Sequence, residues 1–338
     1  MFRETLFPKL PKEFYMKRIA VMTSGGDAPG MNACIRAVVR YGIAAGAEVY
    51  GIRRGYVGMM ENDIFELDSR AVGGIIRSGG TILMSARSKE FRTEEGQAKA
   101  LDVLHGWGIE GLVVIGGDGS LHGAVALHEH GFPVIGVPAS IDNDIPETEM
   151  AIGVDTALNT ILDAMDKIKD TASAHQRAFI IEVMGRQHGY LALMAGIAGG
   201  AELVVLPGVE IKKEVIIREV KSAFMRGKPH FIIIAAEGAS TTEKGIAQIL
   251  SEYVSEAGHD PRSTVLGHVQ RGGAPSCFDR LLGTRFGAAA VDNLFAGNTG
   301  VMVGLKADEI VTADIRTVLS GHPKLNKEAC KLAEPLSH

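Results

Sequence analysis

Two aspartates and an asparagine stand on consecutive positions, Asp142, Asn143 and Asp144, in the stretch "IGVPASIDNDIP". Acidic residues gather in this way in turns, in metal sites and as paired catalytic carboxylates. A turn is one interpretation, because Asp and Asn favour turns and Pro146 restricts Ile145 to extended geometry. Catalysis is the other, because an aspartate with its ordinary pKa of about 3.9 is ionised at neutral pH and accepts protons. Both interpretations stay open, since a rigid turn is also a good mount for a base.

Two glycine loops offer a second kind of chemistry. "VMTSGGDAPGMN" contains Gly25 and Gly26, and "VVIGGDGSLHG" contains residues 116–120, each between an apolar run and a helical pattern. Glycines there let backbone N–H groups approach phosphate, and a helix N-terminus favours negative charge. Neither loop is a Walker A motif, and His122 occupies the place of the last glycine of G-x-G-x-x-G. Asp118 has two interpretations: the N-cap of a helix over about residues 121–129, or a carboxylate that holds Mg²⁺ on nucleotide phosphates.

Arginines stand where a phosphate ligand would need them. Arg87 and Arg92 follow a Gly-Gly-Thr turn in "GGTILMSARSKEFR". Planar guanidinium groups match phosphate oxygens bidentately, so the set predicts a nucleotide and a sugar phosphate as substrates. The further cations at strand ends or in glycine turns are Arg177, Arg186, Arg262, His268 and Arg271.

The elements that must position these residues alternate between strands and helices. Helical patterns cover residues 155–172, with Asp155 as the expected N-cap, and residues 210–226. The alternation predicts a doubly wound α/β fold, in which the carboxyl ends of the strands share one crevice. The glycine loops and residues 142–144 therefore belong to one predicted site. The apolar runs that predict buried parallel strands are "RIAVMTS", "LVVIGG", "FPVIGVP", "AFIIEVMG", "AELVVLP" and "HFIIIAAEG".

Composition limits the class of protein. The 338 residues suit two domains or one large α/β unit, and 46% apolar with 22% charged residues is ordinary globular usage. The net charge of −5 argues against nucleic acid or an anionic membrane as partner. Cys34, Cys277 and Cys330 form no CxxC motif, which predicts a reduced, cytoplasmic protein. No apolar run approaches the roughly 20 residues that span a bilayer. Residues 1–16 are interpreted as an N-terminal extension or as the product of an upstream start codon.

Seven motifs, in order from Thr23 to Gly273, resemble those of the bacterial ATP-dependent 6-phosphofructokinases: "TSGGDAPGMN", "GGTILMSARSKEFR", "IGGDGS", "SIDNDIP", "TASAHQR", "EVMGR" and "TVLGHVQRGG". The resemblance implies a homotetramer of two-lobed subunits, each lobe doubly wound around a largely parallel sheet, with the active site in the cleft between the lobes. It implies transfer of the γ-phosphoryl group of MgATP to the 1-hydroxyl of fructose 6-phosphate, the committed step of glycolysis. The larger, nucleotide-binding lobe would comprise residues 17–153 and 270–320, and the smaller, sugar-phosphate-binding lobe residues 154–269 and 321–338.

The resemblance also assigns roles by position. Asp118 would bind magnesium, Asp142 would be the general base with Asp144 beside it, and Arg87 would offset charge on the transferring phosphoryl group, with Arg186 as a further catalytic residue. The implied ATP-binding residues are Gly26, Tyr56, Arg87, Ser88, Gly117, Asp118, Gly119 and Ser120. The implied sugar-phosphate-binding residues are Ser140, Ile141, Asp142, Met184, Gly185, Arg186, Glu237, His268, Val269, Gln270 and Arg271, with Arg177 and Arg262 reaching in from a neighbouring subunit.

The phosphoryl donor is predicted from two small residues. Pyrophosphate-dependent relatives carry an aspartate in place of Gly119 and a lysine in place of Ala139. An aspartate there would repel the α-phosphate of ATP, whereas glycine leaves room, so the sequence favours ATP. A pyrophosphate-dependent phosphotransferase is the alternative. A regulatory nucleotide-binding homologue without activity is a second alternative, disfavoured because Asp118, Asp142 and Asp144 are all present.

An effector pocket for ADP or phosphoenolpyruvate between subunits is also implied. Ser69, Gly74 and Pro229 replace an arginine, an aspartate and a lysine that are common in the family. Since charged hydrogen bonds are worth roughly 1.5–3 kcal/mol each, lost cations predict altered or weak regulation. The residues that match the pocket are Arg36, Arg40, Lys169, Gly200, Ala201, Glu202, Arg226, Lys228 and His230.

Overall fold

The structure, a computed structural model, describes residues 16–209, 212–240, 242, 244–323, 325 and 327–336. Its larger sheet has the strand order β11-β10-β5-β4-β1-β2-β3. The pairs from β10 to β2 are parallel, while β11 and β3 pair antiparallel at the two edges. The strands are β1 (Arg18–Ser24), β2 (Glu48–Ile52), β3 (Ile64–Glu66), β4 (Gly111–Gly116), β5 (Val134–Pro138), β10 (Val301–Lys306) and β11 (Glu309–Asp314).

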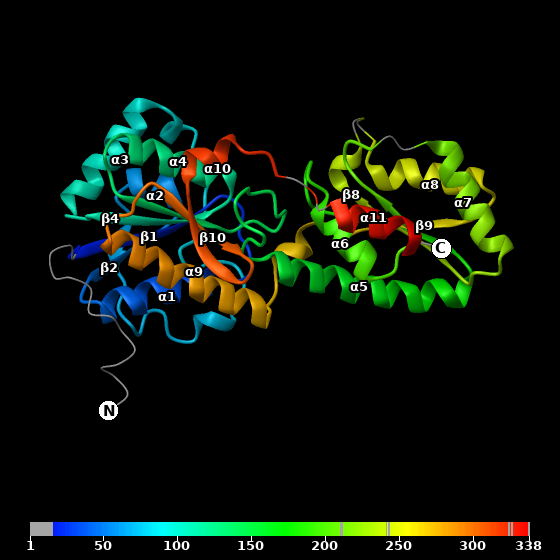
Figure 1. Cartoon of the computed structure of the whole chain (residues 1–338), viewed down its shortest axis with the longest axis horizontal. Helices are drawn as coiled ribbons and strands as arrows, with labels where there is room; N and C mark the ends of the chain where they lie inside the picture. Colours follow the sequence, from blue (N-terminus) through cyan, green and yellow to red (C-terminus); the bar gives the residue numbers. More distant parts are fainter. Residues whose placement is uncertain are drawn as a thin grey trace.

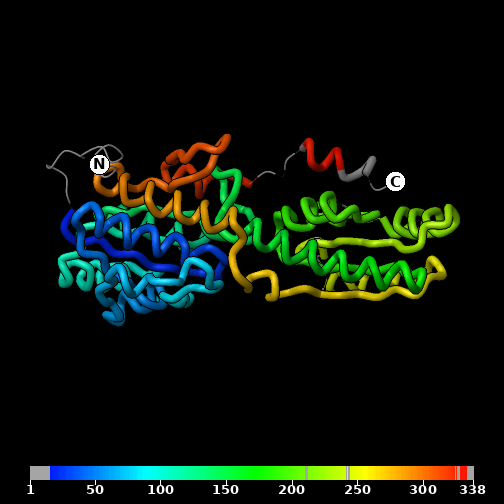
Figure 2. Tube along the Cα trace, turned by 90° about the horizontal axis from the view of Figure 1, so that it is seen from below, coloured from blue at the N-terminus to red at the C-terminus, as the bar shows by residue number. Residues whose placement is uncertain are grey.

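A second sheet of four parallel strands has the order β7-β8-β6-β9. The two sheets form two lobes side by side, joined by chain crossings before α5 and before α9 (Figures 1 and 2). The α/β fold with two doubly wound lobes is thus confirmed, while the expected lobe boundaries stay a prediction. The strands of the second sheet are β6 (Ala178–Val183), β7 (Leu203–Val205), β8 (Phe231–Ala236) and β9 (Pro261–Val265).

Helices cover both faces of the larger sheet. Alternate residues of β1 enter different cores: Ile19 and Val21 face one apolar cluster, and Ala20 and Met22 face another. Burial on both faces explains why this strand is continuously apolar in sequence. The helices around the larger sheet are α1 (Met31–Ala44), α2 (Gly55–Met60), α3 (Glu94–Gly106), α4 (Asp118–Glu129), α9 (Cys277–Phe295) and α10 (Ile315–Ser320). Those of the other lobe are α5 (Val154–His175), α6 (Tyr190–Ala198), α7 (Lys213–Met225), α8 (Ile246–Glu256) and α11 (Lys327–Leu336).

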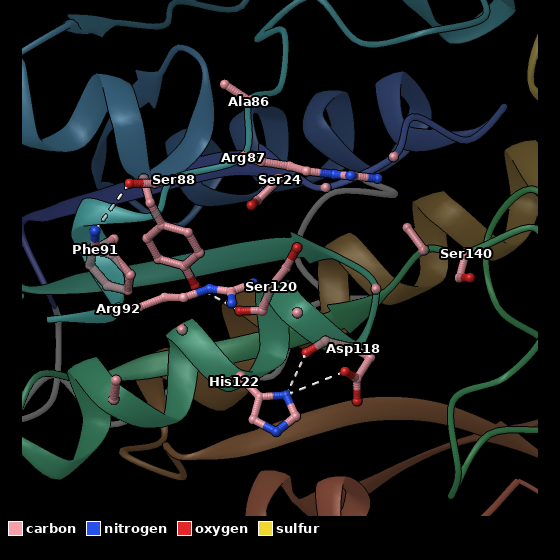
Figure 3. A pocket seen from close by; sticks show the side chains of 18 of the residues that line it. Ser24, Ala86, Arg87, Ser88, Phe91, Arg92, Asp118, Ser120, His122 and Ser140 are labelled. Carbon is pink, nitrogen blue, oxygen red and sulfur yellow. Dashed lines mark hydrogen bonds and ion pairs between the residues drawn. The ribbon is translucent and has the colours of Figure 1, made fainter.

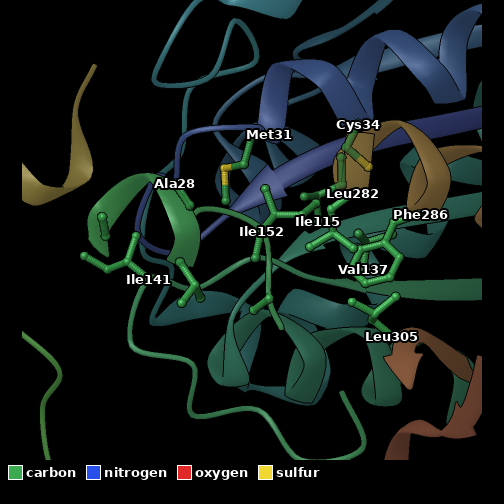
Figure 4. Packing of buried hydrophobic residues seen from close by; sticks show 14 of the residues in the cluster. Ala28, Met31, Cys34, Ile115, Val137, Ile141, Ile152, Leu282, Phe286 and Leu305 are labelled. Atoms are coloured by element: carbon green, nitrogen blue, oxygen red, sulfur yellow. The ribbon is translucent and has the colours of Figure 1, made fainter. Parts of the chain in front are cut away.

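Helices α1 and α9 lie against each other and share the core shown in Figure 4, where Met31 and Cys34 meet Leu282 and Phe286. Glycine permits their close approach: a Cβ on Gly283 would stand 2.7 Å from the Gly30 carbonyl oxygen, and one on Gly287 would stand 2.7 Å from the Cys34 carbonyl oxygen. The contact matters for the site because α1 follows the first glycine loop directly.

The capping prediction for α5 is wrong. Gly153, with φ of 101°, is the N-cap, and Asp155 lies in the first turn. The buried Asp279 of α9 caps the helix instead, because its carboxylate accepts hydrogen bonds from the backbone N–H of Gly153 (2.8 Å), the N–H of Thr156 (2.8 Å) and the Thr156 hydroxyl (2.5 Å). A cap contributed from 123 positions away in the chain leaves no local pattern in the sequence.

The other sequence predictions of elements differ in their ends. The helix expected over residues 210–226 spans Lys213–Met225, and residues 210 and 211 lie outside the described residues. The first strand, β1, begins at Arg18, whereas the proposed N-terminal extension lies outside the described residues except for Met16. Among the described residues, no helix has the length and apolar character needed to cross a membrane.

Candidate active site

A cavity of about 720 Å³ opens at the carboxyl ends of β1, β4 and β5, where the sequence predicted a shared crevice (Figure 3). Every residue implied for ATP binding lines it, and so do Asp142, Arg186 and Arg271. Gly116, Asn143 and Asp144 do not line it, so fewer residues line the cavity than the ranges 116–120 and 142–144 predicted. The lining residues are Ser24, Gly25, Gly26, Tyr56, Ala86, Arg87, Ser88, Phe91, Arg92, Gln97, Gly117, Asp118, Gly119, Ser120, His122, Gly123, Ala126, Ala139, Ser140, Asp142, Arg186 and Arg271.

Polar side chains fix the loop that carries Arg87. The buried Asn32 of α1 donates to the carbonyl oxygens of Ser78 (3.1 Å) and Gly79 (3.2 Å) and accepts from the Ile82 N–H (2.9 Å). The Thr23 hydroxyl of β1 lies 2.8 Å from the Met84 carbonyl oxygen, and the Ser85 hydroxyl donates to the Gly25 carbonyl oxygen at 2.7 Å. These contacts hold the loop that carries Arg87 against the first glycine loop. The Arg87 side chain and the backbone N–H groups of the glycine loop therefore face the same cavity.

The second glycine loop starts helix α4. Gly117 is the N-cap and Asp118 is the first helical residue, so the N-cap interpretation of Asp118 is wrong. Its carboxylate is exposed to the cavity and lies 3.4 Å from Nδ1 of His122. A Cβ on Gly119 would meet nothing within 4 Å, whereas the Ser120 hydroxyl is buried without a hydrogen-bond partner among the described residues. The loop therefore offers open space and a carboxylate to a ligand.

An aromatic pair forms one wall of the cavity. The ring of Tyr56 stacks on Phe91 with 4.0 Å between centroids, and its hydroxyl donates to the Ser120 carbonyl oxygen at 2.7 Å. Gly123 packs against the same ring, because a Cβ there would stand 2.4 Å from Tyr56. Tyr56 therefore couples the loop before α3 to the start of α4.

Asp142 lies at the bottom of the cavity with 1% of its side chain exposed. Its Oδ2 lies 3.2 Å from Nε of Arg186, and its Oδ1 is buried without a hydrogen-bond partner among the described residues. Burial raises the pKa of the Asp142 carboxyl, and the negative charge of Asp144 raises it further, while the charges of Arg186 and Arg271 lower it. The arrangement makes Asp142 a stronger base than an exposed aspartate, with one buried oxygen that has no hydrogen-bond partner among the described residues.

The turn interpretation of the acidic stretch also holds. Asn143 adopts φ of 48°, and its amide group donates to the Glu149 carbonyl oxygen (3.0 Å) and accepts from the Ala151 N–H (3.0 Å). The Ser140 hydroxyl donates to Asp144 at 3.0 Å. Asn143 thus clamps the loop, while the flanking aspartates point to other partners.

Arg186 comes from the second lobe. It follows Gly185, whose φ of 131° favours glycine, and its own φ is 46°. The carboxylate of Glu237 accepts its N–H at 3.2 Å, and Gly238 allows the close approach because a Cβ there would stand 1.8 Å from the Arg186 carbonyl oxygen. The guanidinium group reaches Asp142 and lies 4.0 Å from Asp144. One cation from the smaller lobe therefore faces both carboxylates of the larger lobe.

Several residues implied for sugar-phosphate binding lie beside the cavity without lining it. The buried Gln270 accepts from the Met184 N–H at 3.3 Å and so joins the loop after β6 to the segment Gly267–Arg271. Arg177 and Arg262 lie at the far end of the smaller lobe, where both pair with Asp260 (3.3 and 2.8 Å). The remaining members outside the cavity lining are Ile141, Gly185, Glu237, His268 and Val269.

Part of the implied effector pocket gathers in the smaller lobe. Glu202 lies 3.5 Å from Nζ of Lys228 and 4.0 Å from Nε2 of His230. Nζ of Lys169 bonds the Gly199 carbonyl oxygen, next to Gly200. Arg36 and Arg40 stand on α1 in the other lobe, so one chain does not bring all of these residues together.

The donor set suits magnesium on a nucleotide. Asp118 offers a carboxylate beside backbone N–H groups, and Mg²⁺ is commonly held by one or two carboxylates plus substrate phosphates and water. No cluster of three or more His, Cys, Asp or Glu side chains that could hold a metal occurs in the described part of the chain. A metal at Asp118 would therefore depend on ligands that the substrate brings.

Sequence reasoning missed part of the lining. Ser24, Ala86 and Phe91 line the cavity and stand within quoted motifs, although none of them was given a role, whereas Gln97 and Ala126 stand outside the motifs and reach the cavity through tertiary packing. Phe91 was the easiest of them to predict from the sequence, because it lies between Arg87 and Arg92 in a motif already identified.

Comparison with known proteins adds independent findings. Residues 18–294 match the model of the family described as Phosphofructokinase. The chain is 53% identical over 322 residues to an ATP-dependent 6-phosphofructokinase from Natranaerobius thermophilus, covering 95% of this chain and 100% of that one. It is 51% identical over 323 residues to the ATP-dependent 6-phosphofructokinase of Thermotoga neapolitana, with the same coverage.

Solved structures agree on the architecture. The phosphofructokinase of Saccharomyces cerevisiae superimposes with a TM-score of 0.86 at 35% identity, covering 95% of this chain and 47% of that chain, so this chain spans about half of the yeast one. A pyrophosphate-dependent phosphofructokinase from Marinobacter aquaeolei superimposes with a TM-score of 0.84 at 23% identity, covering 95% and 91% of the two chains. At that identity the second likeness shows the fold alone.

Proposed function

Because the chain belongs to the phosphofructokinase family, it is a phosphotransferase that phosphorylates fructose 6-phosphate with ATP, and we propose that the cavity described above carries out this transfer. The observation that carries the proposal is the meeting of three features in one cavity. Two glycine loops, the carboxylate of Asp118 and the Asp142–Arg186 pair all face the same volume. A binding protein without chemistry would have no need of a buried carboxylate beside a cation with one oxygen unpaired among the described residues.

The glycine loops and Asp118 form the nucleotide side of the proposed site. Backbone N–H groups at the start of α4 face the phosphates, and Arg87 adds charge that favours the anionic transition state. Mg²⁺, held by Asp118 together with the phosphates, would neutralise charge that develops on the transferring group. Phosphoryl transfer passes through a loose transition state, so this positioning and charge stabilisation supply most of the catalysis.

Asp142 serves as the general base. Its carboxylate accepts the proton of the 1-hydroxyl of fructose 6-phosphate as that oxygen bonds to the γ-phosphorus and the bond to ADP breaks. A positioned base contributes about 10²–10⁴-fold to the rate. The positive charge of Arg186 lowers the pKa of Asp142 and so favours the ionised carboxylate, against burial and the charge of Asp144, which raise that pKa. The segment Gly267–Arg271 and Glu237 border this end of the cavity and bind the sugar phosphate.

The donor proposal rests on Gly119 and on the relatives. The space in front of Gly119 is open, which leaves room for the α-phosphate of ATP. Ala139 is buried and lines the cavity, so the position offers no cation to a pyrophosphate. ATP therefore fits this cavity better than pyrophosphate.

The assembly and regulation follow from the same proposal. The enzyme is a cytoplasmic homotetramer in which Arg177 and Arg262 complete the sugar-phosphate site of a neighbouring subunit. Residues 17–153 with 270–320 and residues 154–269 with 321–338 form its nucleotide and sugar-phosphate lobes. The cluster around Glu202 belongs to an effector site for ADP or phosphoenolpyruvate. Its responses are weak or altered, because Ser69, Gly74 and Pro229 replace charged residues that are common in the family. Titration of each effector at subsaturating fructose 6-phosphate tests this, and a strong response would contradict it.

A donor assay tests the central proposal. The purified protein receives fructose 6-phosphate and Mg²⁺ with ATP or with pyrophosphate, and formation of fructose 1,6-bisphosphate is followed. We expect turnover with ATP, and turnover with pyrophosphate alone would overturn the donor assignment. The variant Asp142→Ser should lose about 10²-fold or more in kcat while it binds nucleotide as the natural protein does. Equal loss of both would reduce Asp142 to a structural residue.

A further inference from the structure

His188 joins the two loops that carry the reacting pair. It stands two residues after Arg186, in the loop between β6 and α6, and its backbone N–H donates to the Gly185 carbonyl oxygen at 3.0 Å. Its side chain crosses to the other lobe, where Nδ1 lies 3.3 Å from the backbone oxygen of Asp142. The backbone of His188 therefore belongs to the turn that presents Arg186, and its ring contacts the residue proposed as the base.

The partner of Nδ1 assigns the tautomer of the ring. A carbonyl oxygen only accepts, so the contact requires the proton on Nδ1. Nε2 is buried and has no hydrogen-bond partner among the described residues. In a neutral imidazole only one nitrogen carries the proton, so the Nδ1 contact makes Nε2 the unprotonated nitrogen. The side chain thus offers one directed N–H group, and that group is aimed at Asp142.

Neighbouring contacts restrict the ring. The ring of Tyr190 lies nearly parallel to that of His188, with 6.2 Å between centroids and 7° between planes. The Tyr190 hydroxyl reaches the sulfur of Met150 at 3.4 Å, in the loop that Asn143 clamps. His188 and Tyr190 therefore hold the acidic loop from the smaller lobe, while Asn143 holds it from within.

The carboxylate itself has few restraints. Oδ2 of Asp142 contacts Arg186, whereas Oδ1 has no hydrogen-bond partner among the described residues. The place of the carboxylate therefore depends on the place of the Asp142 backbone, whose carbonyl group His188 holds. A displacement of about 1 Å at a reacting group can lower a rate about 10²-fold.

We propose that His188 is a positioning residue for phosphoryl transfer: its Nδ1–H group holds the Asp142 carbonyl oxygen and so sets the base against Arg186 across the lobe boundary. This inference rests on the proposed function, because it takes Asp142 as the base. It goes further by giving the reaction a residue outside the cavity lining. His188 acts through Asp142 and touches neither substrate.

Three variants of His188 test the directed N–H group. The amide N–H of Asn falls near the place of Nδ1, that of Gln falls near the place of Nε2, and Leu fills the space without a donor. We expect His188→Asn to keep kcat within about threefold, and His188→Gln and His188→Leu to lower kcat about 10- to 100-fold. KM for ATP should stay unchanged in all three, because His188 does not line the nucleotide side of the cavity.

A double-mutant cycle separates positioning from general support of the fold. If His188 acts through Asp142, His188→Gln in the Asp142→Ser background should lower the residual kcat no further. An additive loss would overturn the inference, as would a natural kcat in His188→Gln or an equal loss in the Asn and Gln variants. The Asn–Gln comparison still decides the question if the Leu variant does not fold. Failure of the natural protein to phosphorylate fructose 6-phosphate with ATP would instead refute the proposed function.

Discussion

The two aspartates of the acidic stretch differ in their surroundings although they are separated by one residue. Asp142 is buried, contacts Arg186 and keeps one oxygen without a partner in the described structure. Asp144 accepts from the Ser140 hydroxyl and lies 4.0 Å from the same arginine. The charge of Asp144 raises the pKa of Asp142 and that of Arg186 lowers it, so two neighbours tune one base in opposite directions.

This opposition predicts opposite shifts in the pH profile of the enzyme. Asp142 must be ionised to accept a proton, so kcat should fall as the pH decreases through its raised pKa. Arg186→Leu removes a cation that lowers this pKa, and the fall in kcat should move to higher pH. Asp144→Asn removes an anion that raises it, and the fall should move to lower pH. The measurement is kcat at saturating substrates across the acidic range. Shifts in the same direction for both variants would contradict the assignment of Asp142 as the base.

Gly119 is proposed to favour ATP as the phosphoryl donor, because the absence of a side chain leaves room for the α-phosphate. Because a Cβ there meets nothing within 4 Å, the fold should accept a larger side chain, and only its charge should matter. We expect Gly119→Asp to raise KM for ATP about tenfold or more, since like charges brought together cost several kcal/mol. Gly119→Ala is the matched control, with KM for ATP close to that of the natural protein. Initial rates at varied ATP concentration measure KM for both variants. An equal increase in KM for Ala and Asp would show that the size of the side chain, and not its charge, weakens ATP binding.

At the scale of elements, the sequence predicted β1, β4, β5, β6, β7 and β8 and missed β2, β3, β9, β10 and β11. β1, β4, β5 and β8 are buried along nearly their whole length, which explains their apolar sequences. The polar sequence "PRSTV" of β9 gives no such signal, since that strand is an edge strand with mostly exposed residues. Backbone pairing to a neighbouring strand, not local sequence, makes such a segment a strand.

The glycine loops were predictable because the buried strands before them have a clear apolar signal in the sequence. They follow buried strands directly, and the carboxyl ends of neighbouring parallel strands must meet. His188 was not predictable as a site residue, because its role depends on a contact across the fold with the Asp142 carbonyl oxygen. Phe91 stands in a quoted motif, but its stacking on the Tyr56 ring could not be predicted from the sequence. Functional residues that directly follow a strand could be predicted from the sequence, whereas functional residues that reach the site through tertiary contacts could not.

The capping of α5 by Asp279 leads to a prediction about stability. Asp279→Ala would leave the backbone N–H groups of Gly153 and Thr156 without their acceptor at the crossing between the lobes. Because each buried unpaired group costs about 1–3 kcal/mol, we expect a loss of roughly 2–4 kcal/mol of stability. The control is Asp314→Ala, which removes an exposed cap of α10 and should cost about 1 kcal/mol. Thermal unfolding at one protein concentration measures the stability of both variants. Similar losses of stability would show that the buried cap contributes no more than an exposed one.

At the scale of the whole molecule, one chain does not complete the proposed sugar-phosphate site. Arg177 and Arg262 pair with Asp260 at the edge of the smaller sheet and do not line the cavity of their own chain. The edge strand β9 suits contact with a neighbouring subunit, because its Arg262 is exposed and is oriented by Asp260, which also pairs with Arg177. If each active site takes Asp142 from one subunit and Arg262 from another, defects at the two positions can complement each other.

Subunit mixing tests this sharing. Asp142→Ser and Arg262→Ala proteins, each alone, should have little activity at low fructose 6-phosphate, the first through loss of the base and the second through a raised KM for the sugar phosphate. After denaturation and refolding together in equal amounts, random assembly would leave about one quarter of the sites with both natural residues, and activity should return to about that fraction. Arg92→Ala, which alters a residue on the nucleotide side of the same cavity, is the control partner for Asp142→Ser. If Arg92 and Asp142 serve a site within one chain, that mixture should regain no activity beyond the mean of its parents. The same lack of recovery in the Arg262→Ala mixture would show that each subunit completes its own site.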